Sequence, residues 1–316
     1  MPEKRGKILI IRGGAIGDFI LTLPAIAALR ETFPDTHLEL LGYPKVAELA
    51  RAAGIIDAFR SIEARPLARF FARSAKLDDE WSAYFESFNV IISYLYDPDE
   101  IFKTNVGRAS KAQFIQGQHR PIESEDLHAT AVFLKPLEHL AIFDADLCPK
   151  LTRARTESLA GRWLAAHPGS GSEKKNWPAE KWRELLVRLI TETDSRILLV
   201  SGEAEEDRVK RLALTLPAER VRLAENLPLA ELAALLTGAH AFLGHDSGIT
   251  HIAAALGVPT FIIWGPSNER IWRPLNPNAE ILNKGVRLEN LETNEVFRRI
   301  AARFDKKLEE EQTEKT

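Results

Sequence analysis

The sequence predicts an α/β protein with two Rossmann-like parallel sheets. Short apolar, β-branched runs alternate along the chain with amphipathic helical patterns, an order that is typical of βαβ units. The 316 residues are enough for one large core or, more readily, for two cores of about 150 residues each. Polar loops follow several of the expected strands, and ligands of open α/β sheets bind in such loops.

The expected elements fall into two groups. In the first half, strands are expected at residues 7–12, 37–41, 89–94 and 114–115, and helices at residues 19–32 and, as one or two helices, 66–88. In the second half, strands are expected at residues 163–166, 196–201, 221–224, 241–244 and 260–264. Helices are expected there at residues 179–192, 203–214, 229–237 and 248–256.

Charged and small residues interrupt this pattern near residues 145–160, which places the domain boundary there. We expect one Rossmann-like domain over residues 1–152, a second over residues 153–290, and a C-terminal segment over residues 291–316. That segment contains a helix from residue 293 to about residue 309 and then a polar tail. We expect this helix to pack back on the first domain.

The composition excludes several classes of protein. The net charge of −3 divides into −3 for residues 1–150, with 18 basic and 21 acidic residues, and zero for the rest, with 24 of each. Neither half has the basic excess of a general nucleic-acid binder. The single cysteine, Cys148, cannot form an internal disulfide, and the N-terminal apolar run is too short for a signal peptide, so we expect a cytoplasmic protein. No apolar window is long enough to span a membrane.

The most informative loop lies in residues 242–265, FLGHDSGITHIAAALGVPTFIIWG. An apolar strand leads into Asp246, Ser247 and Gly248, and a helix follows with His251 in its first turn. The free N–H groups of such a helix start are suited to binding a phosphate or diphosphate. The same residue types are also common as an ordinary helix cap.

A glycine-rich loop, RGGAIGD, follows the first strand. Its glycines permit positive φ and a close approach of the backbone to a ligand. Arg12 stands where the first glycine of the dinucleotide fingerprint GxGxxG would fall, which argues against NAD. Asp18 lies at the start of the next helix, where it is either a helix-stabilising carboxylate or a functional one.

The third loop, HPGSGSEKKNWP at residues 167–178, lies between a strand and a helix. It combines hydroxyl groups, small residues and two lysines, which together are suited to holding a phosphate. It lacks the Walker pattern GxxxxGK[ST], and a solvated turn with surface lysines is the alternative.

Taken together, ILIIRGGAIGDFILTLPAIAALRETFP, HPGSGSEKKNWP and GHDSGITHIAAALGVPTFIIWGP resemble the heptosyltransferases of glycosyltransferase family 9. The resemblance covers nearly the whole chain, with the three motifs in the family's order and spacing. It implies the GT-B fold, in which two Rossmann-like domains have parallel sheets facing across a cleft. It also implies lipopolysaccharide biosynthesis, with heptose transferred from ADP-heptose to an inner-core acceptor. The first domain would bind the acceptor and the second the sugar nucleotide.

The resemblance assigns the general base of an inverting transfer to Asp18. The acceptor hydroxyl must lose a proton as it attacks the anomeric carbon opposite the leaving ADP, and a positioned base contributes about 10²- to 10⁴-fold to such a step. Gly13, Gly14 and Gly17 would then lie near the donor or the acceptor.

The resemblance assigns the nucleotide diphosphate to the second domain. The matching positions are Ser170, Ser172, Lys174, Lys175, Asp246, Ser247, Gly248 and His251. The phosphate-binding lysine falls on Lys175, with Lys174 as the alternative one residue away. Cationic groups and a helix start can stabilise a leaving ADP by themselves, and the Asp and His residues show no metal-binding spacing, so we expect no metal and no cofactor.

Two positions depart from the family pattern. His245 stands where the family often has Asn or a small residue, and it either reaches the nucleotide or packs under the loop. The acidic residue that contacts the ribose has no secure match, and Glu225 is the nearest candidate. The preference for ADP over another nucleotide therefore rests on the resemblance.

The acceptor side is expected in the first domain. Residues 60–76 contain five basic residues and only one acidic residue. This excess of positive charge would attract a phosphorylated lipopolysaccharide core and favour peripheral attachment to the inner membrane. A solvated basic helix side is the alternative. The nearby aromatic residues could cover a lipid-proximal surface, although their helical spacing favours a place in the core.

Two other functions are compatible with the same motifs. Another GT-B enzyme, either a transferase for a different nucleotide sugar or a nucleotide-sugar epimerase, would use the same loops. A non-catalytic nucleotide-sugar-binding protein would keep the fold but would not need both Asp18 and Lys175.

Overall fold

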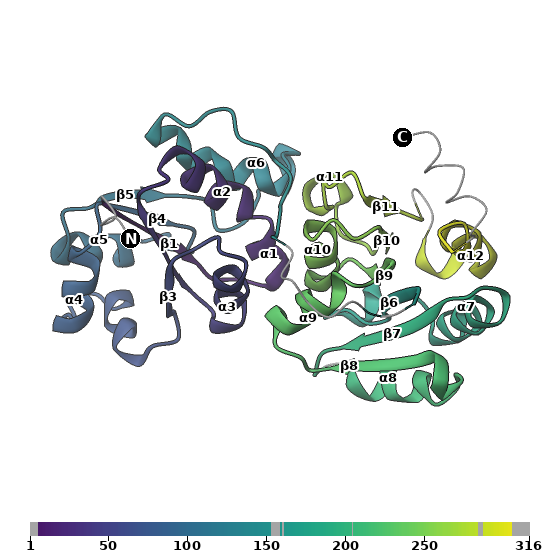
Figure 1. The fold of residues 1–316 in the computed structure, drawn as a ribbon. Coiled ribbons are helices and arrows are strands. Elements are labelled where there is room, and N and C mark those ends of the chain that lie inside the picture. Colours follow the sequence, from purple (N-terminus) through teal and green to yellow (C-terminus); the bar gives the residue numbers. More distant parts are fainter. Residues whose placement is uncertain (1–5, 153–158, 160, 204, 284–286, 305–316) are drawn as a thin grey trace. The chain divides into compact units, whose positions relative to one another are not determined.

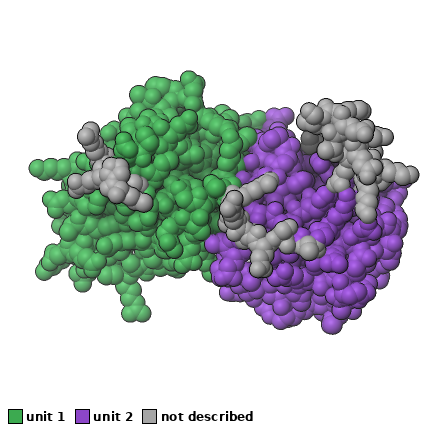
Figure 2. All heavy atoms as spheres, in the orientation of Figure 1, with its two compact units in different colours: residues 1–152 green, residues 153–316 purple. Residues whose placement is uncertain are grey.

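The computed structural model describes residues 6–152, 159, 161–203, 205–283 and 287–304. The chain divides into two compact units, residues 1–152 and 153–316, each built on its own parallel sheet (Figures 1 and 2). The division lies inside the interval 145–160. The prediction of an α/β fold with two parallel sheets is confirmed.

The first unit has a five-stranded sheet in the order β3-β2-β1-β4-β5. Its strands are β1 (Lys7–Arg12), β2 (His37–Gly42), β3 (Ala58–Ser61), β4 (Val90–Ser93) and β5 (Gln113–Gln116). The chain moves from β1 outward to β3 and then returns to the other side of β1, so the direction of the connections reverses between β1 and β4. The edge strand β3 was missed because its half-buried sequence, AFRS, has no apolar run.

The helices of the first unit are α1 (Ile16–Ile20), α2 (Leu23–Thr32), α3 (Pro44–Ala52), α4 (Asp79–Glu86), α5 (Ile101–Ala109) and α6 (Ala129–Leu134). Three 3₁₀ segments are η1 (Arg65–Phe71), η2 (Glu123–Glu125) and η3 (Lys135–Leu140). The single helix expected over residues 19–32 is two helices. Thr22 is the N-cap of α2, and Pro24 occupies its first turn, where a missing N–H is tolerated.

Aromatic side chains fill one face of the first sheet. Phe70, Phe85 and Phe102 from η1, α4 and α5 pack with Leu9 and other strand residues in one buried cluster. Trp81 and Tyr84 of α4 are also buried. Phe71 is 44% exposed but stacks on Phe102 with ring centroids 4.7 Å apart. The interpretation of these aromatic residues as core is therefore confirmed for the buried ones, because their surface is covered by the sheet.

The second unit has a six-stranded sheet in the order β11-β10-β9-β6-β7-β8. Its strands are β6 (Trp163–His167), β7 (Arg196–Ser201), β8 (Val221–Glu225), β9 (Ala241–His245), β10 (Thr260–Ile263) and β11 (Ala279–Ile281). The chain moves from β6 to β8 and then crosses back to β9, so its connections reverse between β6 and β9. The edge strand β11 was missed because its three residues, AEI, are too few to show an alternation of apolar and polar side chains.

The helices of the second unit are α7 (Ala179–Glu192), α8 (Glu206–Ala213), α9 (Leu229–Leu236), α10 (Gly248–Ala255), α11 (Glu269–Trp272) and α12 (Thr293–Ala301). Three 3₁₀ segments are η4 (Glu173–Lys175), η5 (Ala218–Arg220) and η6 (Leu288–Asn290). Alternate strand residues such as Leu164 and Ala166 pack with Leu185 and Leu189 of α7 in one core. This core covers one face of the sheet.

The last described helix, α12, belongs to this same core. Val296 and Ile300 are fully buried in it, and the helix packs on α7. The sequence analysis placed this helix against the first domain, whereas its buried residues pack on α7 of the second unit. Its expected extension to about residue 309 falls partly outside the described residues, which end at Phe304. Among the described residues, none of the helices has both the length and the apolar character that crossing a bilayer requires.

Candidate active site

The loop that follows β1 holds the side chain of Asp18, in α1, in a fixed position. Gly14 has φ of +98°, and a Cβ added there would lie 2.9 Å from Oδ2 of Asp18. The same oxygen accepts a hydrogen bond from the Ala15 N–H at 3.0 Å. The loop can therefore close over the carboxylate only with glycine at this position. The side chain is 26% exposed, and Oδ1 lies 3.9 Å from Nη2 of Arg12 without a hydrogen bond to any described residue, so it is the oxygen that can accept from another partner.

The other two glycines of this loop are less constrained. A Cβ on Gly13 would meet Leu95 at 3.6 Å, an ordinary contact, and Gly17 lies within α1. Beside the loop, a cavity of about 320 Å³ is lined by Gly14, Ala15 and Ile16 and by the start of α3. This cavity lies at the carboxyl edge of the first sheet, where ligands of such sheets bind.

Arg12, the last residue of β1, is a buried cation beside Asp18. The residue is 2% exposed, and its guanidinium lies 4.3 Å from the centroid of the Phe133 ring. Nη1 donates to the His119 carbonyl at 2.8 Å, and Nη2 donates to the Asp18 carbonyl at 3.3 Å, with Oδ1 of Asp18 3.9 Å away. Burial lowers the pKa of Arg12, while the charge of Asp18 opposes that change. Arg12 thus holds α1 at Asp18, a role that the sequence analysis missed.

In the second unit, Lys175 and Asp246 form an ion pair at the reversal between β6 and β9. Nζ of Lys175 donates to Oδ2 of Asp246 at 2.6 Å, and the two side chains are 29% and 8% exposed. The two residues come from the loops after β6 and β9, which the parallel pairing of those strands brings together. Asp246 therefore orients the Lys175 ammonium, and its assignment to the diphosphate site stays a prediction.

The start of α10 presents free backbone donors beside this pair. Ser247 is the N-cap, and its hydroxyl accepts from the Thr250 N–H at 3.4 Å. Within the described residues, the N–H groups of Gly248 and Ile249 have no acceptor, as expected for the first turn of a helix. The cap and the anion-binding interpretations of this motif are therefore compatible, because the cap uses the Thr250 N–H and leaves the two preceding ones open, and the anion-binding interpretation stays a prediction.

His245 packs under the loop and does not reach its surface. Its side chain is fully buried, and Nε2 accepts a hydrogen bond from the Trp177 N–H at 2.8 Å. Nε2 is therefore unprotonated, so Nδ1 carries the proton and faces the Gly169 carbonyl at 3.4 Å. Burial lowers the pKa of His245 to about 3, and nearby His167 adds to this effect. His245 thus ties both ends of the Lys175 loop to β9.

Two more histidines are buried in this region. His167 ends β6, and its Nδ1 lies 3.4 Å from the Ser247 hydroxyl. Burial lowers the pKa of His167 to about 4, so it is neutral at physiological pH. His251 lies in the first turn of α10 and is 4% exposed. The sequence analysis named His251 but missed His167. The position of His167, where a strand meets a polar loop, was the signal that could have identified it.

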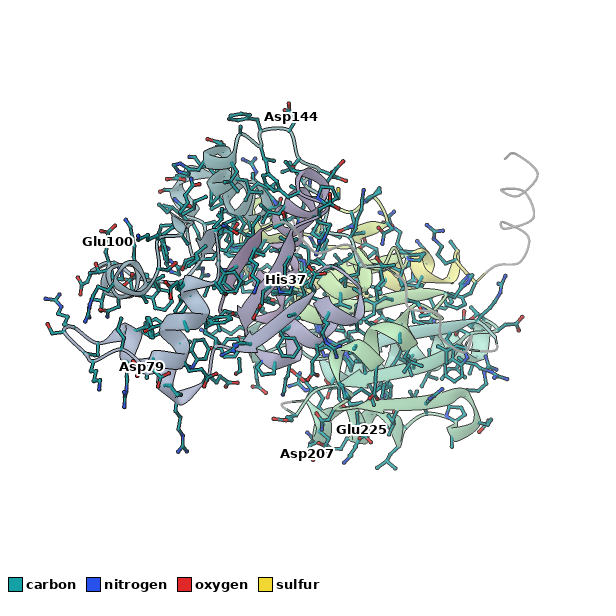
Figure 3. All side chains as sticks on the ribbon, turned by 60° about the vertical axis from the view of Figure 1, so that its left-hand side comes forward. His37, Asp79, Glu100, Asp144, Asp207 and Glu225 are labelled. Carbon is teal, nitrogen blue, oxygen red and sulfur yellow. The ribbon has the colours of Figure 1, made fainter. Side chains whose placement is uncertain are left out.

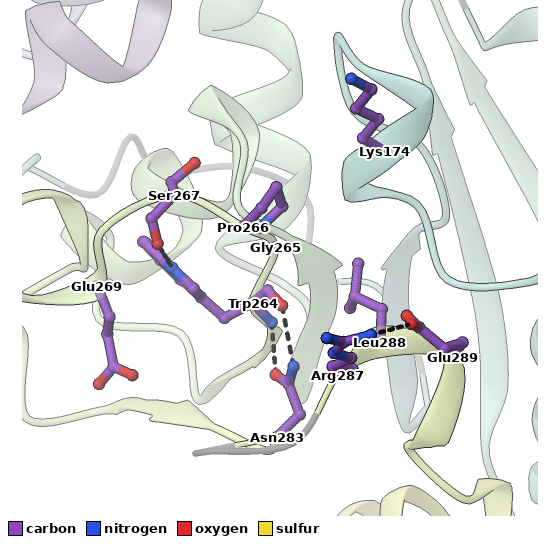
Figure 4. Close-up of a pocket in the computed structure, with 10 residues that line it drawn as sticks. All are labelled: Lys174, Trp264, Gly265, Pro266, Ser267, Glu269, Asn283, Arg287, Leu288 and Glu289. Atoms are coloured by element: carbon purple, nitrogen blue, oxygen red, sulfur yellow. Dashed lines mark hydrogen bonds and ion pairs between the residues drawn. The ribbon is translucent and has the colours of Figure 1, made fainter.

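Of the two serines in the Lys175 loop, Ser170 shapes the loop. The Ser170 hydroxyl lies 2.9 Å from both the Ser172 carbonyl and Oδ1 of Asn176, and the residue is buried. Ser172 is the N-cap of η4 and is exposed. Lys174 lines a cavity of about 530 Å³ (Figure 4), whereas Lys175 bonds to Asp246. The loop therefore brings Lys175, not Lys174, to Asp246.

Glu225 is the last residue of β8, at the carboxyl edge of the second sheet (Figure 3). Its Oε1 is buried without a hydrogen-bond partner in the described part of the chain, and the Lys210 ammonium lies 3.7 Å away. A ribose contact through this carboxylate stays a prediction. Within the same described residues, no three His, Cys, Asp or Glu side chains are grouped as metal ligands. The expected absence of a metal also stays a prediction.

The chain is similar to proteins that are described as heptosyltransferases. Residues 138–299, just over half of the chain, match the family described as glycosyltransferase family 9 (heptosyltransferase). Lipopolysaccharide heptosyltransferase 1 of Pseudomonas aeruginosa is 42% identical over 94 residues, which are 30% of this chain and 26% of that relative. Lipopolysaccharide heptosyltransferase 3 of Escherichia coli K12 is 24% identical over 292 residues, 83% of each chain.

A solved structure shows the same architecture. The E. coli ADP-heptose lipopolysaccharide heptosyltransferase II superimposes with a TM-score of 0.77 at 16% identity, covering 96% of this chain and 99% of the other. At that identity the likeness concerns the fold alone. Two parallel Rossmann-like sheets with polar loops at their reversals define an α/β protein of the GT-B class. The chain belongs to glycosyltransferase family 9, and the prediction of a family 9 glycosyltransferase is thereby confirmed.

The buried histidines predict acid sensitivity of the second unit. The pKa values of about 4 for His167 and about 3 for His245 lie below the unfolded value of about 6.5. Below about pH 6.5 the unfolded chain therefore binds protons that the folded chain does not. The free energy of unfolding should fall by up to about 1.4 kcal/mol per pH unit for each histidine.

Urea unfolding followed by tryptophan fluorescence between about pH 7.5 and about pH 5.5 measures this slope. His245→Asn removes one titrating group, so its slope should be shallower than that of the natural chain. His139→Gln, at an exposed position, is the matched control and should not change the slope. An unchanged slope in His245→Asn would contradict the low pKa assigned to the buried His245.

Proposed function

We propose that the chain is an inverting, metal-independent heptosyltransferase that moves heptose from ADP-heptose to a lipopolysaccharide inner-core acceptor. The observation that carries the proposal is the Lys175 ammonium, held by Asp246 beside the open N–H groups of α10. Family membership and the names of the similar proteins supply the sugar and the nucleotide. The fold alone would not, because one fold hosts many functions.

The donor diphosphate is assigned to the loops after β6 and β9. The N–H groups of Gly248 and Ile249 and the positive end of α10 favour an anion at this place. Lys175 adds a point charge that can stabilise the negative charge developing on the leaving ADP. These groups supply the charge stabilisation that a metal ion would otherwise provide.

Asp18 is assigned the role of general base. As the acceptor hydroxyl oxygen forms its bond to the anomeric carbon, its proton passes to Oδ1 of Asp18. The bond between the anomeric carbon and the phosphate oxygen breaks, and its electron pair leaves with ADP, which inverts the configuration. Support comes from the geometry: Oδ2 is already held by the Ala15 N–H, and the backbone of Asp18 is held by Arg12.

The acceptor and the membrane are assigned to the first unit. Of the five basic residues between positions 60 and 76, Arg60 pairs with Glu80 and Arg73 pairs with Asp99. The other three, Arg65, Arg69 and Lys76, are exposed and have no ion pair within the described residues. Three such cations support attraction of a phosphorylated core or an anionic bilayer surface.

Removing the base should abolish transfer without abolishing donor binding. Asp18→Ala and Asp18→Asn should lower kcat by about 10²- to 10⁴-fold, because the attacking hydroxyl loses its proton acceptor. ADP release from ADP-heptose with defined core acceptors measures the rate, and calorimetry measures the Kd of ADP, which should stay within about twofold of the natural value. Asp35→Asn, at an exposed carboxylate of the same unit, is the control. Retained turnover in Asp18→Ala would overturn the role of Asp18.

Removing the phosphate-site lysine should weaken binding and rate together. Lys175→Ala deletes a charge-assisted hydrogen bond worth about 1.5–3 kcal/mol, so the Kd of ADP should rise about 10- to 100-fold. Circular dichroism checks folding, because Asp246 loses its partner. Lys111→Ala, at an exposed lysine, is the control. An unchanged Kd of ADP would remove Lys175 from the site, and a preference for UDP-sugars over ADP-heptose would favour another GT-B enzyme.

Anionic vesicles test the membrane assignment. At low ionic strength the chain should bind vesicles that contain phosphatidylglycerol, and replacing Arg65, Arg69 and Lys76 together with Ala should weaken that binding by about 100-fold, at about 1 kcal/mol per charge. Neutral phosphatidylcholine vesicles are the control and should bind neither protein. Lack of binding by the natural chain at low salt would refute peripheral attachment through these residues.

A further inference from the structure

A buried positive charge lies beside the proposed general base. Arg12 is the last residue of β1 and is 2% exposed. Burying a cation costs free energy unless the charge is paired and its donors are hydrogen-bonded. In the described part of the chain, Asp18 is the carboxylate that pairs with Arg12, with Oδ1 3.9 Å from Nη2. The fold therefore keeps a guanidinium next to the carboxylate that is assigned the proton of the acceptor.

The guanidinium of Arg12 joins two loops of the first unit. Nη1 donates to the His119 carbonyl at 2.8 Å, and Nη2 donates to the Asp18 carbonyl at 3.3 Å. His119 follows β5 and Asp18 follows β1, and β4 lies between these two strands in the sheet. Neighbouring strands are about 4.8 Å apart, so the two loops begin about 10 Å from each other. The planar guanidinium offers donors in two fixed directions across this gap, which the ammonium of a lysine does not.

Two aromatic rings hold the guanidinium of Arg12 in place. It lies 4.3 Å from the centroid of the Phe133 ring and 5.7 Å from that of the Tyr94 ring. The Tyr94 hydroxyl donates to the Phe133 carbonyl at 2.6 Å, and both side chains are buried. A Cβ on Gly117 would lie 2.8 Å from the Tyr94 ring, so the loop after β5 also closes on this aromatic pair. The position of the guanidinium is therefore set by the fold and not by a ligand.

The helix that carries Asp18 is too short to hold this residue alone. α1 has five residues, and so short a helix depends on contacts with the rest of the fold. The Asp18 carbonyl accepts hydrogen bonds from Nη2 of Arg12 and from the Thr22 hydroxyl, the latter at 2.8 Å. Thr22 lies next to α1 in the chain, whereas Arg12 belongs to β1. Of these two donors, Arg12 is therefore the one that ties Asp18 to the sheet.

The loop after β5 lies within electrostatic reach of Asp18. Burial lowers the pKa of His119, the charges of Arg12 and Arg120 lower it further, and the charge of Asp18 raises it. The His119 ring packs on the Tyr96 ring, with the two centroids 4.7 Å apart. The carboxylate and this loop are therefore close neighbours at the carboxyl edge of the sheet, and Arg12 is hydrogen-bonded to the backbone of both.

We propose that Arg12 is a positioning residue for the transfer: it fixes the place of Asp18 relative to the loop after β5 and affects the rate only through Asp18. The inference rests on the proposed function, because it takes Asp18 as the general base. A catalytic group must be held within about 0.5 Å of its productive position, and a misplacement of about 1 Å can cost about 10²-fold in rate. The competing explanation is that Arg12 stabilises the fold and has no part in the transfer.

The test is a double-mutant cycle, with kcat measured by ADP release at saturating acceptor and the Kd of ADP-heptose by calorimetry. Arg12→Met removes both arms of the guanidinium, so kcat should fall about 10- to 100-fold while the Kd of ADP-heptose stays within about twofold. In the Asp18→Ala background the same substitution should change kcat by less than about twofold, because the residue through which Arg12 acts is absent. Arg51→Met, at an exposed arginine of the same unit, is the matched control and should leave kcat unchanged in both backgrounds.

Arg12→Lys provides the same test if melting temperatures show that Arg12→Met is not folded. Lysine keeps the charge but not the two fixed donor directions, so kcat should fall about tenfold, and only where Asp18 is present. An unchanged kcat in the folded variants would overturn the inference, as would an equal loss in both backgrounds or a loss confined to the Kd of ADP-heptose. If Asp18→Ala by itself keeps full turnover, the proposed role of Asp18 fails first, so the two failures are distinguishable.

Discussion

Both candidate sites depend on one topological constraint, the reversal of connections beside the first strand of each sheet. In the order β3-β2-β1-β4-β5 the reversal lies between β1 and β4, and in the second sheet it lies between β6 and β9. At such a point the helices leave to opposite faces, so the loops diverge and open a crevice. The Asp18 loop follows β1, and the Lys175 and Asp246 loops follow β6 and β9. The candidate site residues of each unit therefore lie where the topology leaves room for a ligand.

In the second unit, the buried His245 fixes the position of the loop that carries Lys175. Its imidazole accepts from the Trp177 N–H and faces the Gly169 carbonyl, so it holds the loop of Lys175 on the strand that carries Asp246. Both ring nitrogens are used in this way, which lowers the cost of burying a polar group. With the loop held, Lys175 meets Asp246 and Lys174 lies at a different cavity. Two neighbouring residues of similar chemistry are thereby given different surroundings.

Most of the regular elements could be predicted because their signals are local. The strands β1 and β7 and the helix α7 begin and end at the expected residues, since each is a continuous apolar run or a clear helical stripe. The edge strands β3 and β11 could not be found this way, because they are short and gain order only from pairing with β2 and β10. The division of residues 19–32 into α1 and α2 depends on the turn between them, which helical periodicity does not reveal.

The sequence by itself determined the class of fold, and it singled out the three polar loops and Asp18, Lys175 and Asp246 as candidate site residues, because these follow from local patterns and from motif resemblance. Only the tertiary structure decided what each loop residue touches. Lys175 meets Asp246 across 71 residues of sequence, His245 meets Trp177 across 68, and Arg12 meets the His119 carbonyl across 107. Hydrogen bonds and charges act over a few ångströms, and proximity between such distant residues exists only after the strands have paired.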